Sequence, residues 1–148
     1  MADQLNSLFR EIIMDHYKNP RNKGLKENLE VYQINNPTCG DKLILQVEIK
    51  DNVIQNIYHQ SIGCSISTSS CSIMSETLKG KTVDEAIDFI HNYIHMLHGE
   101  DYNHHIEMGD TMAYEGIKNY PARFKCASIS WELVLNVLKR IKKEKQGE

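Results

Sequence analysis

A change in hydrophobic periodicity between residues 30 and 60 constrains the fold of this chain more than any other feature of its sequence. From residue 42 to residue 50, apolar side chains alternate with polar ones except at Ile44, and this period of two predicts a half-buried strand. Asp51-Asn52 predicts a tight turn into a second strand over residues 53–60, and residues 31–34 are expected to form a third. Three antiparallel strands need a covering layer. The expected fold class is therefore α+β, with a three-stranded antiparallel sheet covered by helices.

Helical segments on both sides of this region are expected to supply the cover. An apolar stripe at helical spacing includes Leu5 and should end near Asn19, because Pro20 follows. A serine-rich helix is expected to begin near Cys64 and to be terminated by Gly80. Further helices are expected over residues 82–97, where Thr82 and Glu85 form a capping-box pattern, and over residues 127–143, with a short helical stretch over residues 111–116.

Length and composition narrow the class of protein. A chain of 148 residues is expected to form one domain spanning residues 1–148, large enough to bury a core without disulfides. A net charge of -3 argues against a nucleic-acid partner, and no run approaches the roughly 18 apolar residues of a membrane span. No signal-peptide pattern is present, so the protein is expected in the cytoplasm. It is also expected to be monomeric when free. In the reducing cytoplasm its four cysteines favour metal binding or catalysis.

Three of the four cysteines are expected at the edges of regular elements. Cys39 follows the first strand, with Asp41 two residues later; Cys64 begins a helix, and Cys126 is expected to precede the last helix. Gly40 can adopt a positive φ, which would turn Cys39 and Asp41 toward one point. Three sulfurs and one oxygen would complete a tetrahedral zinc site. The long gaps between the cysteines leave open whether they converge.

The residues around these cysteines form motifs that are more specific than the spacing. They are Asn36-Pro37-Thr38-Cys39-Gly40-Asp41, Gly63-Cys64-Ser65-Ile66-Ser67 and Pro121-Ala122-Arg123-Phe124-Lys125-Cys126-Ala127, preceded by Asp15-His16-Tyr17-Lys18-Asn19-Pro20-Arg21-Asn22. In this order, and over nearly the whole chain, they resemble the IscU/SufU family of iron–sulfur assembly scaffolds and sulfur acceptors. That family also forms the N-terminal domain of NifU.

Two departures from the IscU branch favour the SufU branch. IscU proteins carry a histidine immediately before the third cysteine, where this chain has Lys125. The chaperone-binding Leu-Pro-Pro-Val-Lys segment of IscU is replaced here by residues 119–123. The stretch between Cys64 and Cys126 is similar to the SufU insertion. SufU proteins are zinc-binding sulfurtransferases that accept persulfide sulfur from the cysteine desulfurase SufS.

The resemblance implies a role for each residue that matches a motif. Cys39, Asp41, Cys64 and Cys126 would bind Zn²⁺, and Cys39 would also accept the sulfur from a SufS-type desulfurase. Arg123 would hold an acidic side chain or assist ligand exchange; a plain surface ion pair is an equally weighted alternative. The implied partners are the desulfurase and downstream components of iron–sulfur assembly.

Other functions stay open beside the sulfurtransferase. The same four ligands could hold a [2Fe–2S] or [4Fe–4S] cluster, as on an assembly scaffold. Alternatively, zinc could only stabilise a non-catalytic module whose function is to bind a partner. A thiol–disulfide redox protein is disfavoured, because the sequence has no Cys-x-x-Cys pair.

Several other metal-ligating residue types are expected to be structural. Cys71 follows Cys64 by two helical turns and is interpreted as a buried, inert residue. His16 continues an apolar stripe and is expected to pack at a helix end. His91, His95 and His98 share one helical face, which is interpreted as a solvated flank because no carboxylate or cysteine is spaced to complete a metal site.

Overall fold

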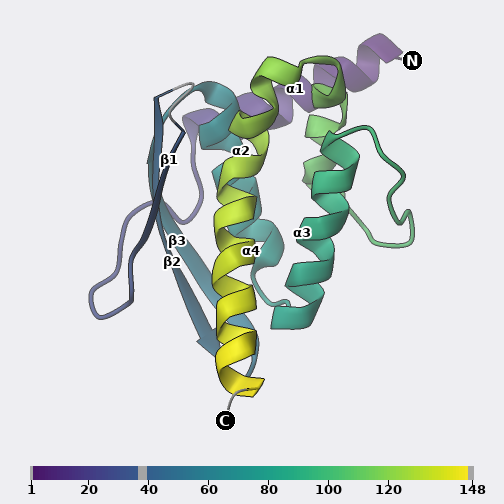
Figure 1. Cartoon of the computed structure of the whole chain (residues 1–148). Coiled ribbons are helices and arrows are strands. Elements are labelled where there is room, and N and C mark those ends of the chain that lie inside the picture. Colours follow the sequence, from purple (N-terminus) through teal and green to yellow (C-terminus); the bar gives the residue numbers. More distant parts are fainter. Residues whose placement is uncertain (1, 37–39, 147–148) are drawn as a thin grey trace.

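The computed structural model describes residues 2–36 and 40–146, with the side chains of residues 7–36 and 40–145. Three consecutive strands are preceded by one helix and followed by the others, which is the segregated order of an α+β fold (Figure 1). In chain order the elements are α1 (Ala2–Lys18), β1 (Tyr32–Asn36), β2 (Asp41–Lys50), β3 (Val53–Ile62), α2 (Ser65–Leu78), α3 (Val83–Leu97), the 3₁₀ helices η1 (Gly109–Asn119) and η2 (Pro121–Arg123), and α4 (Phe124–Gln146).

The sheet has the predicted three antiparallel strands, in the order β1-β2-β3. Asp51 and Asn52 connect β2 to β3 with φ values of 53° and 65°, the two positive values that a type I′ hairpin turn needs. At the other end of β2, Asn36 pairs with Asp41 across the β1–β2 ladder. The predicted sheet and its hairpin are therefore confirmed, and Asp41 is the first residue of its strand.

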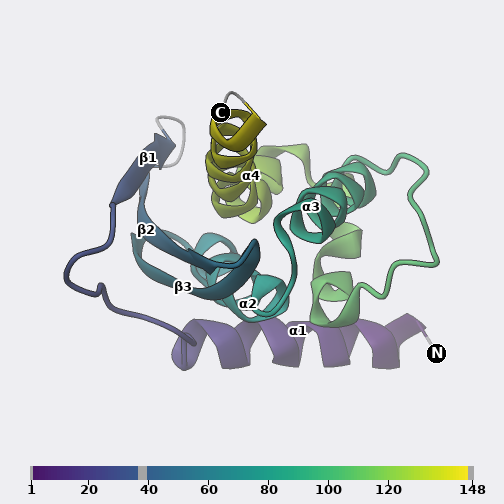
Figure 2. The same ribbon diagram turned by 90° about the horizontal axis from the view of Figure 1, so that it is seen from below.

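Helices cover the sheet in the arrangement seen in Figure 2. α2 and α4 contact the strands and each other, α3 packs against α4, and α1 runs along the outside of α2 and η1. Buried hydrophobic side chains from the strands and from α2, α3, η1 and α4 form one continuous core cluster. None of the helices in residues 2–36 and 40–146 combines the length and hydrophobicity that a membrane crossing requires.

The strand alternation correctly gives Leu43 and Leu45 as core residues, but it places Gln46 wrongly on an exposed polar face. Gln46 is buried, because the segment between α1 and β1 passes over it. Its side-chain amide accepts a hydrogen bond from the Lys26 N–H and donates to the carbonyls of Lys26 and Leu29, each within 3.2 Å. The Gln46 side chain thus forms hydrogen bonds with backbone groups of the irregular segment between α1 and β1.

The serine-rich α2 is a core helix whose hydroxyls are hydrogen-bonded. Ser70 is fully buried; it accepts a hydrogen bond from Trp131 Nε1 at 2.9 Å and donates to the Ala127 carbonyl at 2.7 Å. Tyr93 Oη donates to the same carbonyl at 2.8 Å. Small side chains allow α2 to lie close to α4, and the hydroxyls supply the partners that buried polar groups require. This network ties α2, α3 and α4 together one residue beyond Cys126.

Helix boundaries confirm most expectations, with one correction. The capping box at Thr82 and Glu85 is formed, α2 ends at Leu78 two residues before Gly80, and the expected stretch over residues 111–116 lies within the longer η1. The last helix, however, begins at Phe124 rather than at Ala127. Pro121 does not break the chain there; it opens η2, which runs directly into α4. Cys126 therefore lies in the first turn of α4 and not before it.

Two histidines are buried beside the segment that follows α1. His16 is buried as expected, and its Nδ1 lies 2.8 Å from Ser72 Oγ. His59 Nε2 lies 2.6 Å from the Arg21 carbonyl, so this nitrogen carries the proton, while the buried Nδ1 has no partner among the described residues. Burial lowers the pKa of His59 below its ordinary 6.5, and nearby Lys23 lowers it further, although the Arg21 carbonyl acts in the opposite direction.

We expect Ser70→Ala to destabilise the protein by about 1–3 kcal/mol, because it leaves the Trp131 N–H buried without an acceptor. The free energy of unfolding is measured with denaturant. Ser7→Ala, at an exposed position of α1, is the control and should change stability by no more than about 0.5 kcal/mol. Equal effects of the two substitutions would contradict this role of Ser70.

Stability should fall as the pH drops from 6.5 toward the lower native pKa of His59, because only the unfolded chain takes up a proton there. In His59→Gln this loss should be smaller than in the wild type when unfolding is compared at about pH 7.5 and about pH 5.5. His105→Gln, at an exposed loop position, should leave the pH dependence unchanged. An identical pH dependence in His59→Gln and the wild type would refute the assignment.

Candidate metal centre

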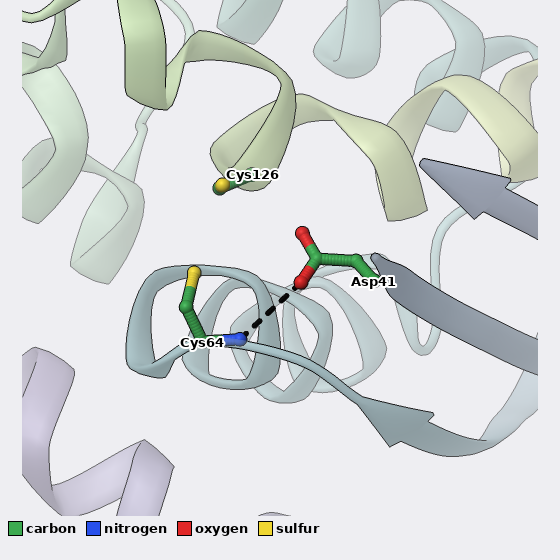
Figure 3. Close-up of side chains that lie close together, drawn as sticks. All are labelled: Asp41, Cys64 and Cys126. Carbon is green, nitrogen blue, oxygen red and sulfur yellow. Dashed lines mark hydrogen bonds between the residues drawn. The ribbon is translucent and has the colours of Figure 1, made fainter. Parts of the chain in front are cut away.

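Three of the predicted ligands lie together where the sheet meets two helices (Figure 3). Asp41 begins β2, Cys64 is the N-cap residue of α2, and Cys126 lies in the first turn of α4. One carboxylate oxygen and the two Sγ atoms all lie within 4.8 Å of one another. The sequence left this convergence open, and the structure shows it for these three residues. Metal binding by them stays a prediction.

Cys39, predicted as both ligand and sulfur acceptor, lies outside the described residues. The residue that follows it is described: Gly40 has a φ of 72°, and its N–H donates to the Asn36 carbonyl at 2.8 Å. The expectation that Gly40 adopts a positive φ is therefore confirmed. Asp41 comes next in the chain, so Cys39 is two residues away from a side chain of the cluster.

The carboxylate of Asp41 is almost completely withdrawn from solvent, with 4% of the residue exposed. Its Oδ1 accepts a hydrogen bond from the Cys64 N–H at 3.3 Å, whereas its Oδ2 is buried and has no hydrogen-bond partner among the described residues. A buried carboxylate oxygen without a partner is costly, unless a cation or proton satisfies it. This orphaned oxygen, beside two sulfurs, fits a metal ion.

Both cysteines lie at the N-terminal end of a helix, where the helix dipole stabilises a thiolate. Burial alone would raise the pKa of the Cys64 thiol. Hydrogen bonds from the backbone and hydroxyl of Ser67, from Cys126 and from the backbone of Ile66 outweigh burial, so the pKa lies below its ordinary value. Cys64 is partly exposed and Cys126 is buried, so the cluster opens to solvent on the side of Cys64.

Two thiolates and one carboxylate oxygen form a donor set that zinc uses in proteins, and four-coordinate zinc would accept one further ligand. Ser67, three residues after Cys64, was not singled out from the sequence. Its Oγ donates to the Cys64 carbonyl at 3.1 Å and lies 3.7 Å from Cys64 Sγ. A serine at the third position after a helix-capping cysteine is a local pattern that could have indicated this contact.

Arg123, predicted to act in catalysis, is the last residue of η2 and is exposed, three residues before Cys126. In the described parts of the chain none of the ion pairs involves Arg123, whereas Lys125 pairs with Glu132 at 2.8 Å. The role of Arg123 stays a prediction.

The residues interpreted as structural behave as expected. Cys71 is fully buried, and burial raises the pKa of its thiol well above the ordinary range. His91 and His95 are exposed on α3, and His98 is exposed at its C-cap, where its ring packs on Phe124 with the ring centroids 3.9 Å apart. In the part of the chain that the structure describes, Asp41, Cys64 and Cys126 form the single cluster whose geometry suits a metal.

Comparisons with known proteins agree with this fold. A family model described as the NifU-like N terminal domain matches residues 8–127. The chain is 41% identical over 128 residues to the zinc-dependent sulfurtransferase SufU of Bacillus subtilis, covering 86% of this chain and 87% of that protein. It is 33% identical to the iron–sulfur cluster assembly scaffold protein IscU of Streptococcus pyogenes, covering 93% of this chain and 86% of that one.

A solved structure shows the same arrangement. It is described as that of an iron–sulfur cluster assembly scaffold protein for the SUF system of Fervidobacterium islandicum. The two folds superpose with a TM-score of 0.80 at 31% identity, over 86% of this chain and 93% of that one.

Asp41→Ala should weaken zinc retention by at least about 10-fold, because it removes the oxygen donor and the buried negative charge. Competition between the zinc-loaded protein and a chromophoric chelator measures the loss. Asp88→Ala, at an exposed position of α3, is the matched control and should retain zinc as the wild type does. If Asp41→Ala also retained zinc unchanged, Asp41 would not be a ligand.

Proposed function

Because the chain belongs to the NifU-like N-terminal domain family, we propose that it acts in iron–sulfur cluster assembly as a zinc-dependent sulfurtransferase. In this role it accepts persulfide sulfur from a SufS-type cysteine desulfurase and so stimulates desulfurase turnover. The observation that carries the proposal is the convergence of Asp41, Cys64 and Cys126, whose donor atoms lie within 4.8 Å of one another. The name of the Bacillus subtilis relative, a zinc-dependent sulfurtransferase, supports the same function.

The proposed ligands of zinc are Cys39, Asp41, Cys64 and Cys126. The buried Oδ2 of Asp41 supports Asp41 as a ligand, because a cation would satisfy it. The two helix N-termini support Cys64 and Cys126, because they stabilise the thiolate forms that bind a cation. When bound, zinc keeps its cysteine ligands deprotonated. Cys71 is not proposed as a ligand, because it lies in the hydrophobic core and outside the cluster of Asp41, Cys64 and Cys126.

Sulfur transfer requires a thiolate, because the thiolate is the nucleophile in exchange at sulfur. In the proposed reaction, the thiolate of Cys39 attacks the outer sulfur of the desulfurase persulfide. A new S–S bond forms on Cys39 as the original S–S bond breaks, and the desulfurase cysteine leaves as a thiolate. Electrons balance without an oxidant or a reductant, since one disulfide-type bond replaces another.

The surface around the site suits an encounter with a negatively charged persulfide. Arg123 and Lys125 are exposed just before Cys126, and Lys125 is paired with Glu132. Arg123 is therefore proposed to hold an acidic side chain, or to assist ligand exchange, when the desulfurase docks. Downstream components of iron–sulfur assembly would then take the sulfur from Cys39.

The chain is further proposed to work in the cytoplasm as one domain spanning residues 1–148, monomeric until a partner binds. Neither nucleic acid nor membrane is a proposed partner, consistent with the net charge of -3.

A second candidate function is a scaffold on which an iron–sulfur cluster is assembled and passed to apoproteins. The similarity to the IscU scaffold of Streptococcus pyogenes favours it, since the same ligand types could hold iron. Metal content separates the two functions. Tight, stoichiometric zinc in the purified protein supports the sulfurtransferase, whereas a reconstituted cluster that transfers to an apoprotein supports the scaffold.

Cys39→Ala should abolish stimulation of a SufS-type desulfurase, because no thiolate remains to accept the sulfur. The measurement is cysteine turnover by the desulfurase with and without the zinc-loaded protein. Cys71→Ala is the control: it removes a thiol that is buried in the core, and it should stimulate as the wild type does. Full stimulation by Cys39→Ala would rule out Cys39 as the acceptor, and no stimulation by the zinc-loaded wild type would refute the sulfurtransferase.

A further inference from the structure

Gly63 lies between the end of β3 and Cys64, against the carboxylate of Asp41. A Cβ atom placed on Gly63 would lie 2.5 Å from Asp41 Oδ1 and 3.0 Å from Asp41 Cγ. Real Cβ atoms do not approach other heavy atoms as closely as the first of these distances. The carboxylate thus occupies the volume that any side chain at residue 63 would need.

Space, and not backbone conformation, is what demands glycine here. Gly24, Gly40 and Gly80 have positive φ values that favour glycine by themselves, but Gly63 is outside that group. The φ of Gly63 is therefore not what requires glycine at this position. The contact with Asp41 is therefore separable from the fold of the loop.

A second contact reinforces the first. The same Cβ would lie 2.4 Å from the Oγ of Ser67, which donates to the Cys64 carbonyl at 3.1 Å and lies 3.7 Å from Cys64 Sγ. Asp41 and Ser67 thus both occupy the space where a side chain on Gly63 would lie. Both contact Cys64, one through its N–H and the other through its carbonyl and sulfur.

The contact with Gly63 fixes which oxygen of Asp41 is available. Seated against Gly63, Oδ1 accepts the Cys64 N–H at 3.3 Å, as the dashed line in Figure 3 shows. The other oxygen, Oδ2, lies on the side of Cys126 in the same view and is buried without a partner in the described ranges. Oδ2 is thus the oxygen of the carboxylate that is left without a protein partner.

We propose that Gly63 is a positioning residue of the metal centre: the absence of a side chain lets Asp41 dock on the Cys64 N–H and present a single oxygen to zinc. The inference rests on the proposed function in one respect, namely that Asp41 is a zinc ligand. A single oxygen beside thiolates suits four-coordinate zinc, whereas calcium and magnesium prefer several oxygen ligands. Gly63 thereby favours zinc over harder cations.

The test compares Gly63→Ala with Gly116→Ala, where no atom lies within 4 Å of the added Cβ and φ is not positive. Zn²⁺ affinity is measured by chelator competition. Loss of an outer-shell contact typically costs about 10- to 100-fold in metal affinity, so this loss is expected for Gly63→Ala and no change for Gly116→Ala. In the Co²⁺-substituted protein, the intense ligand-field bands of a four-coordinate site should weaken in Gly63→Ala, a change that a general loss of stability would not produce.

A double-mutant cycle separates positioning from a general structural effect. The cycle is run in a Ser67→Ala background, because Ser67 Oγ would also lie 2.4 Å from the added Cβ. When Asp41→Ala is present in that background, the carboxylate is absent as well, so adding Gly63→Ala should lower Zn²⁺ affinity by less than about twofold. If Gly63→Ala failed to fold in the Ser67→Ala background, recovery of folding on adding Asp41→Ala would support the contact, because the clash that remains there is with Asp41. Additive losses, or a variant with Asp41→Ala that also fails to fold, would overturn the proposal.

These experiments test the positioning role of Gly63 and the proposed sulfurtransferase function separately. Wild-type Zn²⁺ affinity and Co²⁺ spectrum in Gly63→Ala would overturn the positioning role, whatever the desulfurase assay shows. Unchanged affinity in Asp41→Ala would overturn it as well, since its premise would be lost. Failure of the wild type to stimulate a desulfurase would refute the sulfurtransferase without altering the affinities measured here.

Discussion

The buried carboxylate of Asp41 is the constraint on which the arrangement of the site depends. Its Oδ2 has no partner within the described residues, and two thiols lie within 4.8 Å of the carboxylate. Without a cation or bound protons, the carboxylate and the two thiolates would be three negative charges close together and poorly solvated. This arrangement would be unfavourable in free energy. Metal binding and the charge state of the three groups are therefore one equilibrium, because binding releases any protons that the thiols carry.

Core packing sets the distance between the two cysteines. Cys64 caps α2 and Cys126 lies in the first turn of α4, and these helices contact each other directly. Ser70 joins them through Trp131 and the carbonyl of Ala127, the residue next to Cys126. A serine-rich helix is thus suited to its place, since small side chains allow close approach and their hydroxyls satisfy buried polar groups. The polar core network therefore holds α4 at the residue that follows Cys126 in the proposed metal centre.

The sequence predicted the sheet because alternation and the turn at Asp51-Asn52 are local signals. It missed the burial of Gln46, since that depends on an irregular segment passing over the strand. It also placed the start of α4 too late, because Pro121 is equally compatible with a chain break and with the first turn of a helix. The convergence of Asp41, Cys64 and Cys126 could not follow from spacing alone, because packing of three distant elements creates it.

Gly63 illustrates how the position of a carboxylate ligand can restrict which residue fits at a neighbouring position in the chain. A cysteine offers a metal one sulfur atom, whose position is set by the side-chain rotamer. A carboxylate can offer one oxygen or two, so neighbouring groups must fix its orientation. The Cys64 N–H fixes Asp41 Oδ1, and the bare Cα of Gly63 makes room for that contact. The backbone between β3 and α2 is therefore part of the proposed metal centre. Cys39 directly precedes Gly40 in the sequence. If Asp41, Cys64 and Cys126 hold the zinc, the thiolate of Cys39 would be the predicted ligand that is free to accept sulfur.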